Sequence, residues 1–167
     1  MAALNPPLTK DDFLNVDWLD AIANSERKDC YFYQKAFWEK IYIAKAAGNA
    51  REQAVFEILA TVTNVGIISE SNKELFAQDF QRFTDEQLSF LAEIVSEVSD
   101  PELQARIADI LWVRQRNHHM AQLAISAYLK SATEQQDPED GYCFERIERA
   151  FRLACQPLPD RNCGCSY

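Results

Sequence analysis

Glycine and proline are scarce in this sequence, and it contains no long hydrophobic run. Only 4 Gly and 6 Pro occur among 167 residues, and most of the prolines lie near the two ends. Because both residues break helices, the middle of the chain is free to form long ones. No apolar segment approaches the roughly 20 residues of a transmembrane helix, and residues 1–10 lack the order of a signal peptide. We therefore expect a cytoplasmic protein with no membrane partner.

Positive charge is also in short supply. The chain has 17 Lys and Arg against 26 Asp and Glu, which gives a formal net charge of -9. A chain this acidic is repelled by phosphate backbones, which argues against nucleic acid as a partner. The five cysteines are an odd number in a chain without an export signal, so we expect reduced thiols.

Hydrophobic residues are plentiful, at 47% with 11% aromatics, which suits one folded domain with a real core. Apolar residues recur with the period of a helix, and no segment has the alternation of a strand. Seven helices are expected, beginning near Thr9, Asp29, Asn49, Thr84, Asp100, Asn117 and after the turn at residues 137–141. The sequence predicts an all-α fold of antiparallel pairs, tetratricopeptide-like or α-solenoid-like, over residues 1–157, followed by a flexible tail over 158–167.

Capping residues support most of these starts. Thr84 and Gln87 form a capping box, and Asp100 caps a helix that has Pro101 at its first position. Asn117 is a natural break between two helices. The first helix is expected to run unbroken from Thr9 to about Ser25. The segment from residue 67 to 83 is the least regular and reads as a connector held to the core by its phenylalanines.

The predicted buried faces follow the helical spacing of apolar residues. In the second helix this face comprises Tyr33, Phe37, Ile41 and Ala44, widened by Tyr31, Trp38 and Tyr42. In the last helix it comprises Cys143, Ile147, Ala150, Phe151 and Ala154. The charged residues of the last helix are expected to form a solvated surface: Glu145, Arg146, Glu148, Arg149 and Arg152.

Four segments carry a family resemblance: LATVTN at 59–64, DPELQARIADILW at 100–112, AQLAISAYLKSA at 121–132 and ERIERAFRLA at 145–154. Together they resemble the helical N-terminal region of a group of uncharacterised bacterial proteins with a domain of unknown function. The resemblance implies a helical fold and no particular activity. It leaves open whether this chain is a full-length protein or an N-terminal domain.

Larger members of that group continue into a second domain with an Arg-Asn-x-x-x-His motif, similar to helical ribonucleases. In this chain, Arg116-Asn117 is followed by Ala121 at the histidine position, and Arg161-Asn162 by Ser166. Neither pair matches the motif. Nuclease activity implied by the larger relatives is therefore not carried over to this chain.

The best candidates for chemistry are Arg114 and His119, whose spacing also occurs in helical ribonucleases. The arginine would stabilise phosphate charge, and the histidine would move a proton. The alternative interpretation is an exposed turn between two helices, which the predicted cap at Asn117 favours. A metal-independent ribonuclease is therefore the second hypothesis, and we expect that the chain is not an enzyme.

No metal or cofactor site is predicted. Zinc sites use Cys-x-x-Cys pairs, whereas Cys143, Cys155, Cys163 and Cys165 have other spacings. Cys143 and Cys155 fall in an apolar stripe, where cysteine acts as a small hydrophobe. Gly-rich phosphate loops and nucleophile motifs are absent from the sequence.

The sequence is thus best interpreted as a non-enzymatic helical scaffold that binds another protein or a downstream domain. Three tryptophans, Trp18, Trp38 and Trp112, are more typical of core than of a ligand platform. Trp112, however, is expected to reach the open edge of the helical stack. The candidate interaction residues are Trp112, Arg114, Arg116, His118 and His119. The partner and the oligomeric state are not predicted.

Overall fold

The protein is all-α in the part of the chain that the computed structural model describes, residues 6–67, 78–134 and 141–156. This confirms the predicted fold class. The helices are α1 (Lys10–Leu14), α2 (Trp18–Ala23), α3 (Cys30–Ala46), α4 (Ala50–Thr63), α6 (Asp85–Ile94), α7 (Pro101–Gln115), α8 (His118–Glu134) and α9 (Gly141–Ala154), with a 3₁₀ helix η1 (Asp79–Arg82) before α6. None of these helices is both long and apolar enough to cross a lipid bilayer.

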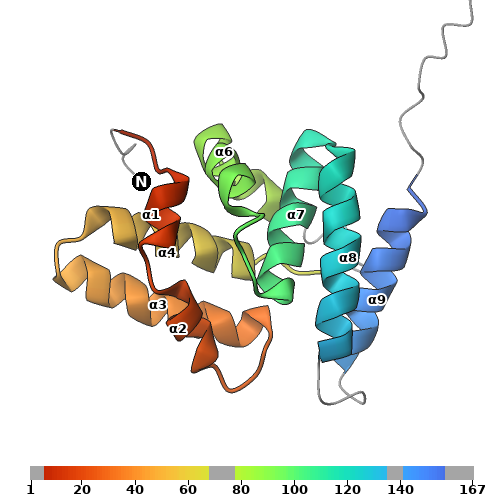
Figure 1. The fold of residues 1–167 in the computed structure, drawn as a ribbon, viewed down its shortest axis with the longest axis horizontal. Helices are drawn as coiled ribbons and strands as arrows, with labels where there is room; N and C mark the ends of the chain where they lie inside the picture. Colours follow the sequence, from red (N-terminus) through yellow and green to blue (C-terminus); the bar gives the residue numbers. More distant parts are fainter. Residues whose placement is uncertain (1–5, 68–77, 135–140, 157–167) are drawn as a thin grey trace, which may run out of the picture.

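Two groups of helices make up the molecule. Helices α3 and α4 pack against each other as one antiparallel pair, with α1 and α2 beside them. Helices α7, α8 and α9 stand side by side as the second group, with α8 in contact with both neighbours (Figure 1). Helix α6 lies between the two groups, preceded along the chain by η1. Helix α9 is the last of this row, so one of its sides has no described helix against it.

The predicted caps are present where the main helices begin. The Asp29 carboxylate accepts hydrogen bonds from the backbone N–H groups of Tyr31 and Phe32. Thr84 and Gln87 form the reciprocal capping box, and the Asp100 carboxylate accepts from Leu103 N at 2.8 Å with Pro101 at the first position. Each cap satisfies amide groups that have no partner within the helix.

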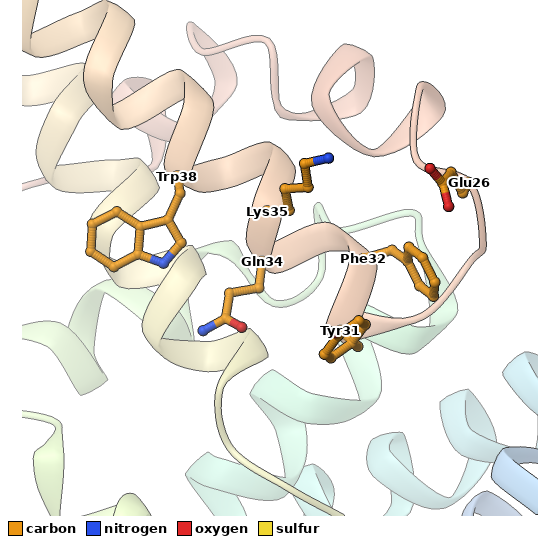
Figure 2. A pocket seen from close by; sticks show the side chains of 6 residues that line it. All are labelled: Glu26, Tyr31, Phe32, Gln34, Lys35 and Trp38. Carbon is orange, nitrogen blue, oxygen red and sulfur yellow. The ribbon is translucent and has the colours of Figure 1, made fainter.

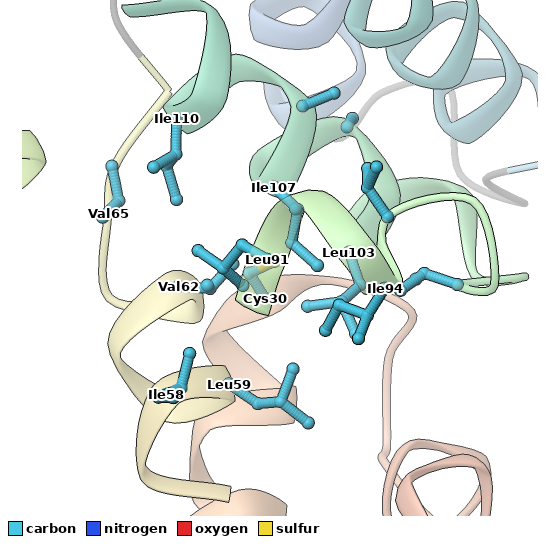
Figure 3. Close-up of a cluster of buried hydrophobic side chains, with 14 of the residues drawn as sticks. Cys30, Ile58, Leu59, Val62, Val65, Leu91, Ile94, Leu103, Ile107 and Ile110 are labelled. Atoms are coloured by element: carbon cyan, nitrogen blue, oxygen red, sulfur yellow. The ribbon is translucent and has the colours of Figure 1, made fainter. Parts of the chain in front are cut away.

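The core lies where α3, α4, α6 and α7 meet. Leu59 and Val62 of α4 face Leu91 of α6 and Ile107 of α7 across this junction (Figure 3). The thiol of Cys30 is buried among these apolar side chains. The same core extends along α8 and reaches α9 through Ala150 and Leu153.

The first helix is shorter than predicted. The segment expected to run unbroken to Ser25 is divided into α1 and α2, with Asn15 ending the first and Asp17 capping the second through Asp20 N. On one straight helix, Phe13 and Trp18 would point about 140° apart. The break lets both rings enter the core and stack with their centroids 5.2 Å apart.

The predicted core face of α3 is too wide. Tyr33, Phe37, Ile41 and Ala44 are buried as expected, but Tyr31, Trp38 and Tyr42 are exposed. Among the described helices, α3 packs mainly against α4 and α2, and the side of α3 with these three aromatic residues is turned toward solvent. In the connector, Phe80 and Phe83 are buried as predicted. The capping box expected at residues 71–74, the start of the turn at 137–141 and the tail after Pro157 lie outside the described residues.

Candidate functional site

The predicted interaction residues cluster where α7 passes into α8, and the side chains of all but His119 make contacts within the fold. Trp112 is buried and its indole Nε1 donates to Gln156 Oε1 at 2.9 Å. It therefore does not lie at an open edge, which corrects the expectation from the sequence. The contact joins the end of α9 to α7.

Arg114 holds the 3₁₀ helix against α7. Its Nη1 donates to the carbonyl oxygens of Phe80 at 2.7 Å and Phe83 at 2.9 Å. Phe80 is the second residue of η1 and Phe83 follows its last residue, so the guanidinium holds both sides of this turn. An arginine used in this way has a structural role and is poorly placed to stabilise a phosphate.

Arg116, His118 and His119 form the turn itself. Arg116 ends α7 in the left-handed conformation, φ 54°, and its guanidinium lies 5.3 Å from the Trp112 ring centroid. That cation–π contact offsets the strain of a non-glycine residue in this conformation. The His118 ring also packs against the Trp112 ring in a tilted arrangement, with the two centroids 5.2 Å apart. The His119 backbone N–H donates to Asn117 Oδ1 at 3.0 Å. As the cap at Asn117 predicted, Arg114 and His119 belong to different helices.

A cluster of buried charges lies beneath α9, and the sequence did not predict it. The buried ion cluster consists of Glu102, Arg106 and Asp109 of α7 with Arg146 and Arg149 of α9. Arg146 Nε donates to Glu102 Oε2 at 2.6 Å, and Arg106 donates to the other oxygen of the same carboxylate from Nε and Nη2. From α8, the Ser131 hydroxyl adds a third donor at 2.9 Å. One carboxylate thus joins three helices.

Asp109 repeats this arrangement two turns further along α7. Arg149 binds it through two parallel hydrogen bonds, Nε to Oδ2 at 2.8 Å and Nη2 to Oδ1 at 2.6 Å. The Tyr128 hydroxyl of α8 donates to Oδ2 at 3.0 Å. Paired arginine–carboxylate geometry of this kind is both strong and directional. It fixes the register of α9 against α7, with the two helices running in the same direction.

The charges of the cluster stabilise each other in their ionised forms. Burial alone would raise the pKa of Glu102, but Arg106 and Arg146 outweigh it and hold that pKa below its usual value. Burial alone would lower the pKa of Arg149, and the Asp109 carboxylate reverses this. Burial raises the pKa of the Tyr128 phenol well above its usual value, so this hydroxyl stays a hydrogen-bond donor.

Because Arg146 and Arg149 point inward, three large apolar side chains lie on the outer side of α9. Arg146 and Arg149 are 1% and 4% exposed, whereas Phe144, Ile147 and Phe151 are 68%, 46% and 68% exposed. We call these last three residues the α9 apolar face. The prediction that Ile147 and Phe151 are core is wrong. The prediction that Arg146 and Arg149 form a solvated surface is wrong for the same reason: buried carboxylates on α7 attract the arginines and rotate the helix.

A hollow on the outer side of α3 is the other surface feature with exposed aromatic groups. It has a volume of about 350 Å³, and Tyr31, Gln34 and Trp38 line it from successive turns (Figure 2). Glu26 and Lys35 contribute one charge of each sign. Gln34 is already bonded to Asn64 Oδ1 at 3.2 Å. The hollow therefore has no convergent set of polar groups such as a small-molecule site requires.

The cysteines do not gather into a site in the described ranges. Cys143 is half-buried with its thiol 3.5 Å from the Ala132 carbonyl oxygen, and Cys155 is exposed, contrary to its predicted place in an apolar stripe. Cys163 and Cys165 lie outside those ranges. Within them, no three His, Cys, Asp or Glu side chains are arranged to hold a metal ion.

Comparison with known proteins places the chain in a family. The family model described as "Domain of unknown function (DUF7380)" matches residues 3–162. The chain belongs to this family. The match covers every helix described above, including α9 and the buried ion cluster, so DUF7380 is a helical domain in this protein. No curated protein and no solved structure matches the chain.

Proposed function

We propose that this DUF7380 domain is a non-enzymatic helical module that binds another protein through the α9 apolar face. The observation that carries the proposal is the orientation of α9, which buries two arginines and exposes two phenylalanines and an isoleucine on one side. Terminal helices of stacked helical proteins need a polar outer side or a partner. The outer side of α9 is apolar, which favours a partner.

The arrangement of the face suits an apolar protein surface. With 3.6 residues per turn, the three side chains lie within about 60° of one another around the helix. Burying a phenylalanine or isoleucine side chain completely is worth about 1.5–3 kcal/mol. Aromatic anchors of this kind supply much of the binding energy in protein interfaces. Glu145, Glu148 and Arg152 flank the face and provide a polar rim on one side.

The ribonuclease alternative has less support. Its two candidate residues lie on different helices, and the Arg114 guanidinium is bonded to the carbonyl groups of Phe80 and Phe83. The net charge of -9 disfavours RNA as a substrate. RNA cleavage by the purified chain that is lost on His119→Ala would favour this alternative.

The packing of α3 on α4, of α7 on α8 and of α8 on α9 supports the tetratricopeptide-like pairing of helices that is part of this proposal. A cytoplasmic location and a bacterial source rest on the sequence alone.

The test is an affinity capture from host lysate, with and without nuclease, in which three forms of the tagged chain are compared. Wild type should retain one or more proteins that Phe144→Ser/Phe151→Ser loses. The matched control is Tyr31→Ser/Tyr42→Ser, which removes two exposed aromatics of α3 and should retain the same proteins. Circular dichroism checks that all three are folded. Loss with both double variants, or with neither, contradicts the proposal.

A further inference from the structure

Helix α9 has two faces that can each be buried against the neighbouring helices. The buried face consists of Arg146, Arg149, Ala150 and Leu153, and the other is the α9 apolar face. At about 100° per residue, the centres of the two faces lie about 140° apart around the helix. Both faces repeat with the spacing of a helical stripe, so either one can lie along a neighbouring helix.

Ion pairs hold α9 in its observed orientation. Arg146 and Arg149 are buried and pair with Glu102 and Asp109 of α7. The described apolar part of this face is small, because Ala150 and Leu153 are its members in the hydrophobic core. The opposite orientation would cover two phenylalanines and an isoleucine, so apolar burial alone favours it. The charges therefore decide which face of α9 is buried.

We propose that Glu102 and Asp109 are positioning residues for partner binding, because their charges hold the α9 apolar face outward. Without these charges, α9 rotates by about 140° about its own axis and buries that face against α7 and α8. The effect on binding rests on the proposed function, whereas the rotation of the helix does not.

The wild type keeps its arginines inward because rotation would separate each buried acid from a cation. Asp109 would keep the Tyr128 hydroxyl at 3.0 Å but lose Arg149. Glu102 would keep Arg106 but lose Arg146. A buried charge that loses its partner is strongly destabilising. The two acids thus keep the apolar face available at the surface.

Removing both charges reverses this balance. In the variant Glu102→Gln/Asp109→Leu, the Arg149 guanidinium no longer has a carboxylate beneath it, and burying an unpaired charge is costly. Rotation of α9 returns both of its inward arginines to water and covers the α9 apolar face instead. The glutamine amide still offers an acceptor to Arg106, so α7 retains this contact within the helix.

The residues beside the α9 apolar face allow the second packing. At about 100° per residue, Ala154 and Cys155 lie at the two edges of the face, and both are small. Glu148 is the charge nearest to the face; it lies about 70° from the centre of the face and pairs with Arg152 of the same helix. The rotated helix therefore approaches its neighbours with small side chains and keeps its charges toward water.

The first experiment is maleimide labelling of the full chain, read at each cysteine by mass spectrometry. Cys155 is exposed and lies about 50° from the centre of the α9 apolar face. Leu153 is buried on the other face, and Leu153→Cys places a second reporter there. In the otherwise wild-type chain, Cys155 should react and the reporter at position 153 should be protected. Adding Glu102→Gln/Asp109→Leu should exchange these two reactivities.

The exchange distinguishes rotation from a general loss of structure. A helix that detaches or unfolds leaves both thiols reactive, whereas a rotated helix protects Cys155. The matched control adds Phe144→Ser/Phe151→Ser to the variant without the acids. This control removes the apolar face that rotation would bury, so Cys155 should remain reactive.

The second measurement is the affinity capture described above. The variant Glu102→Gln/Asp109→Leu should lose the captured proteins, although every residue of α9 is unchanged. If this double variant does not fold, Asp109→Leu alone replaces it. The single variant should shift both thiol reactivities in the same directions by a smaller amount, because Glu102 still holds Arg146.

Two labelling results would overturn the inference: reactivities that stay as in the wild type, or two reactive thiols after the acids are replaced. Either result leaves the proposed function to its own test with Phe144→Ser/Phe151→Ser. An exchange of reactivities together with unchanged capture would reject the positioning role and the proposed function, because binding would not need the apolar face. Exchange together with loss of capture supports both.

Discussion

Glu102 is the residue on which the C-terminal row of helices depends most. Its carboxylate is 1% exposed and accepts hydrogen bonds from Arg106, Arg146 and Ser131 on three different helices. Burying a charge is costly unless its partners are in place, and removing one partner leaves the others uncompensated. Two guanidiniums therefore share this one acid as a partner.

We predict that Glu102→Gln lowers the free energy of unfolding by about 3–5 kcal/mol at pH 7. The pKa of Glu102 is held below its usual 4.5, so the ionised carboxylate stabilises the fold. That contribution is complete above pH 4.5 and is lost as the pH falls through the lowered pKa of the folded state. The difference between wild type and variant should therefore shrink in acid. Urea titrations between pH 7 and pH 3 measure it.

Asp12 provides the control, because Arg51 also lowers its pKa but at the molecular surface, far along the chain from α9. Asp12→Asn should reduce the pH dependence of the unfolding free energy by a smaller amount. In this background, Glu102→Gln should lower the unfolding free energy by as much as it does in the wild type. If Glu102→Gln lowers the unfolding free energy equally at pH 7 and pH 3, the assignment of an ionised Glu102 carboxylate is wrong.

At the scale of elements, most helices could be predicted from the sequence and the orientation of one could not. Caps such as Thr84 and Asp100 are local, so they mark helix starts without knowledge of the fold. The face that a helix buries depends on its neighbours. In α9, the spacing of the residues allows two buried faces: the apolar stripe, or a stripe of Arg146, Arg149, Ala150 and Leu153. The second face is the buried one, because its arginines pair with acids more than 35 residues earlier in the chain.

One signal in the sequence could have revealed this choice. Asp109 interrupts the apolar segment Ile107–Leu111, and a lone acid in such a segment needs a buried cation. Glu102 lies seven residues earlier and therefore on the same side of α7. Two acids on one side of a core helix predict two basic residues on a neighbour. The candidate interaction residues, in contrast, were chosen for their chemical type, and Trp112 and Arg114 are used internally.

The orientation of α9 predicts opposite outcomes for two neighbouring substitutions. Leu153→Ala removes a buried side chain, 4% exposed, and should cost about 2–5 kcal/mol of unfolding free energy. Phe151→Ala removes an exposed ring and should change stability by less than about 1 kcal/mol. Thermal or urea unfolding at low protein concentration measures both without a contribution from association.

The opposite result would mean that α9 buries its other face. A costly Phe151→Ala with a tolerated Leu153→Ala would restore the face expected from apolar spacing. It would also remove the basis for the α9 apolar face as a binding surface.

At the scale of the whole molecule, α7, α8 and α9 form one cooperative unit through the buried ion cluster. We predict that a chain ending at residue 134 is destabilised and aggregates, because Glu102 and Asp109 lose Arg146 and Arg149 and because α8 loses the helix that packs against it. Replacing the acids in the shortened chain, with Glu102→Gln and Asp109→Leu, should recover part of the stability. Light scattering and circular dichroism follow both effects.

A shortened chain that is as stable and monomeric as the full one would show that α9 is an appendage. If the two replacements do not restore any stability to the shortened chain, its instability comes from the exposed apolar surface alone and not from the uncompensated acids.

The distance along the chain between each buried acid and its arginine also affects how the protein is made. Glu102 and Arg146 are 44 residues apart, and Asp109 and Arg149 are 40 apart. At about 5–20 residues per second, a ribosome needs several seconds to add that length. During this interval, α7 and α8 carry two acids whose partners do not yet exist, whereas the α3–α4 pair is already complete. During synthesis, the α3–α4 pair therefore packs first, and α7 and α8 complete their ion pairs only after α9 has been made.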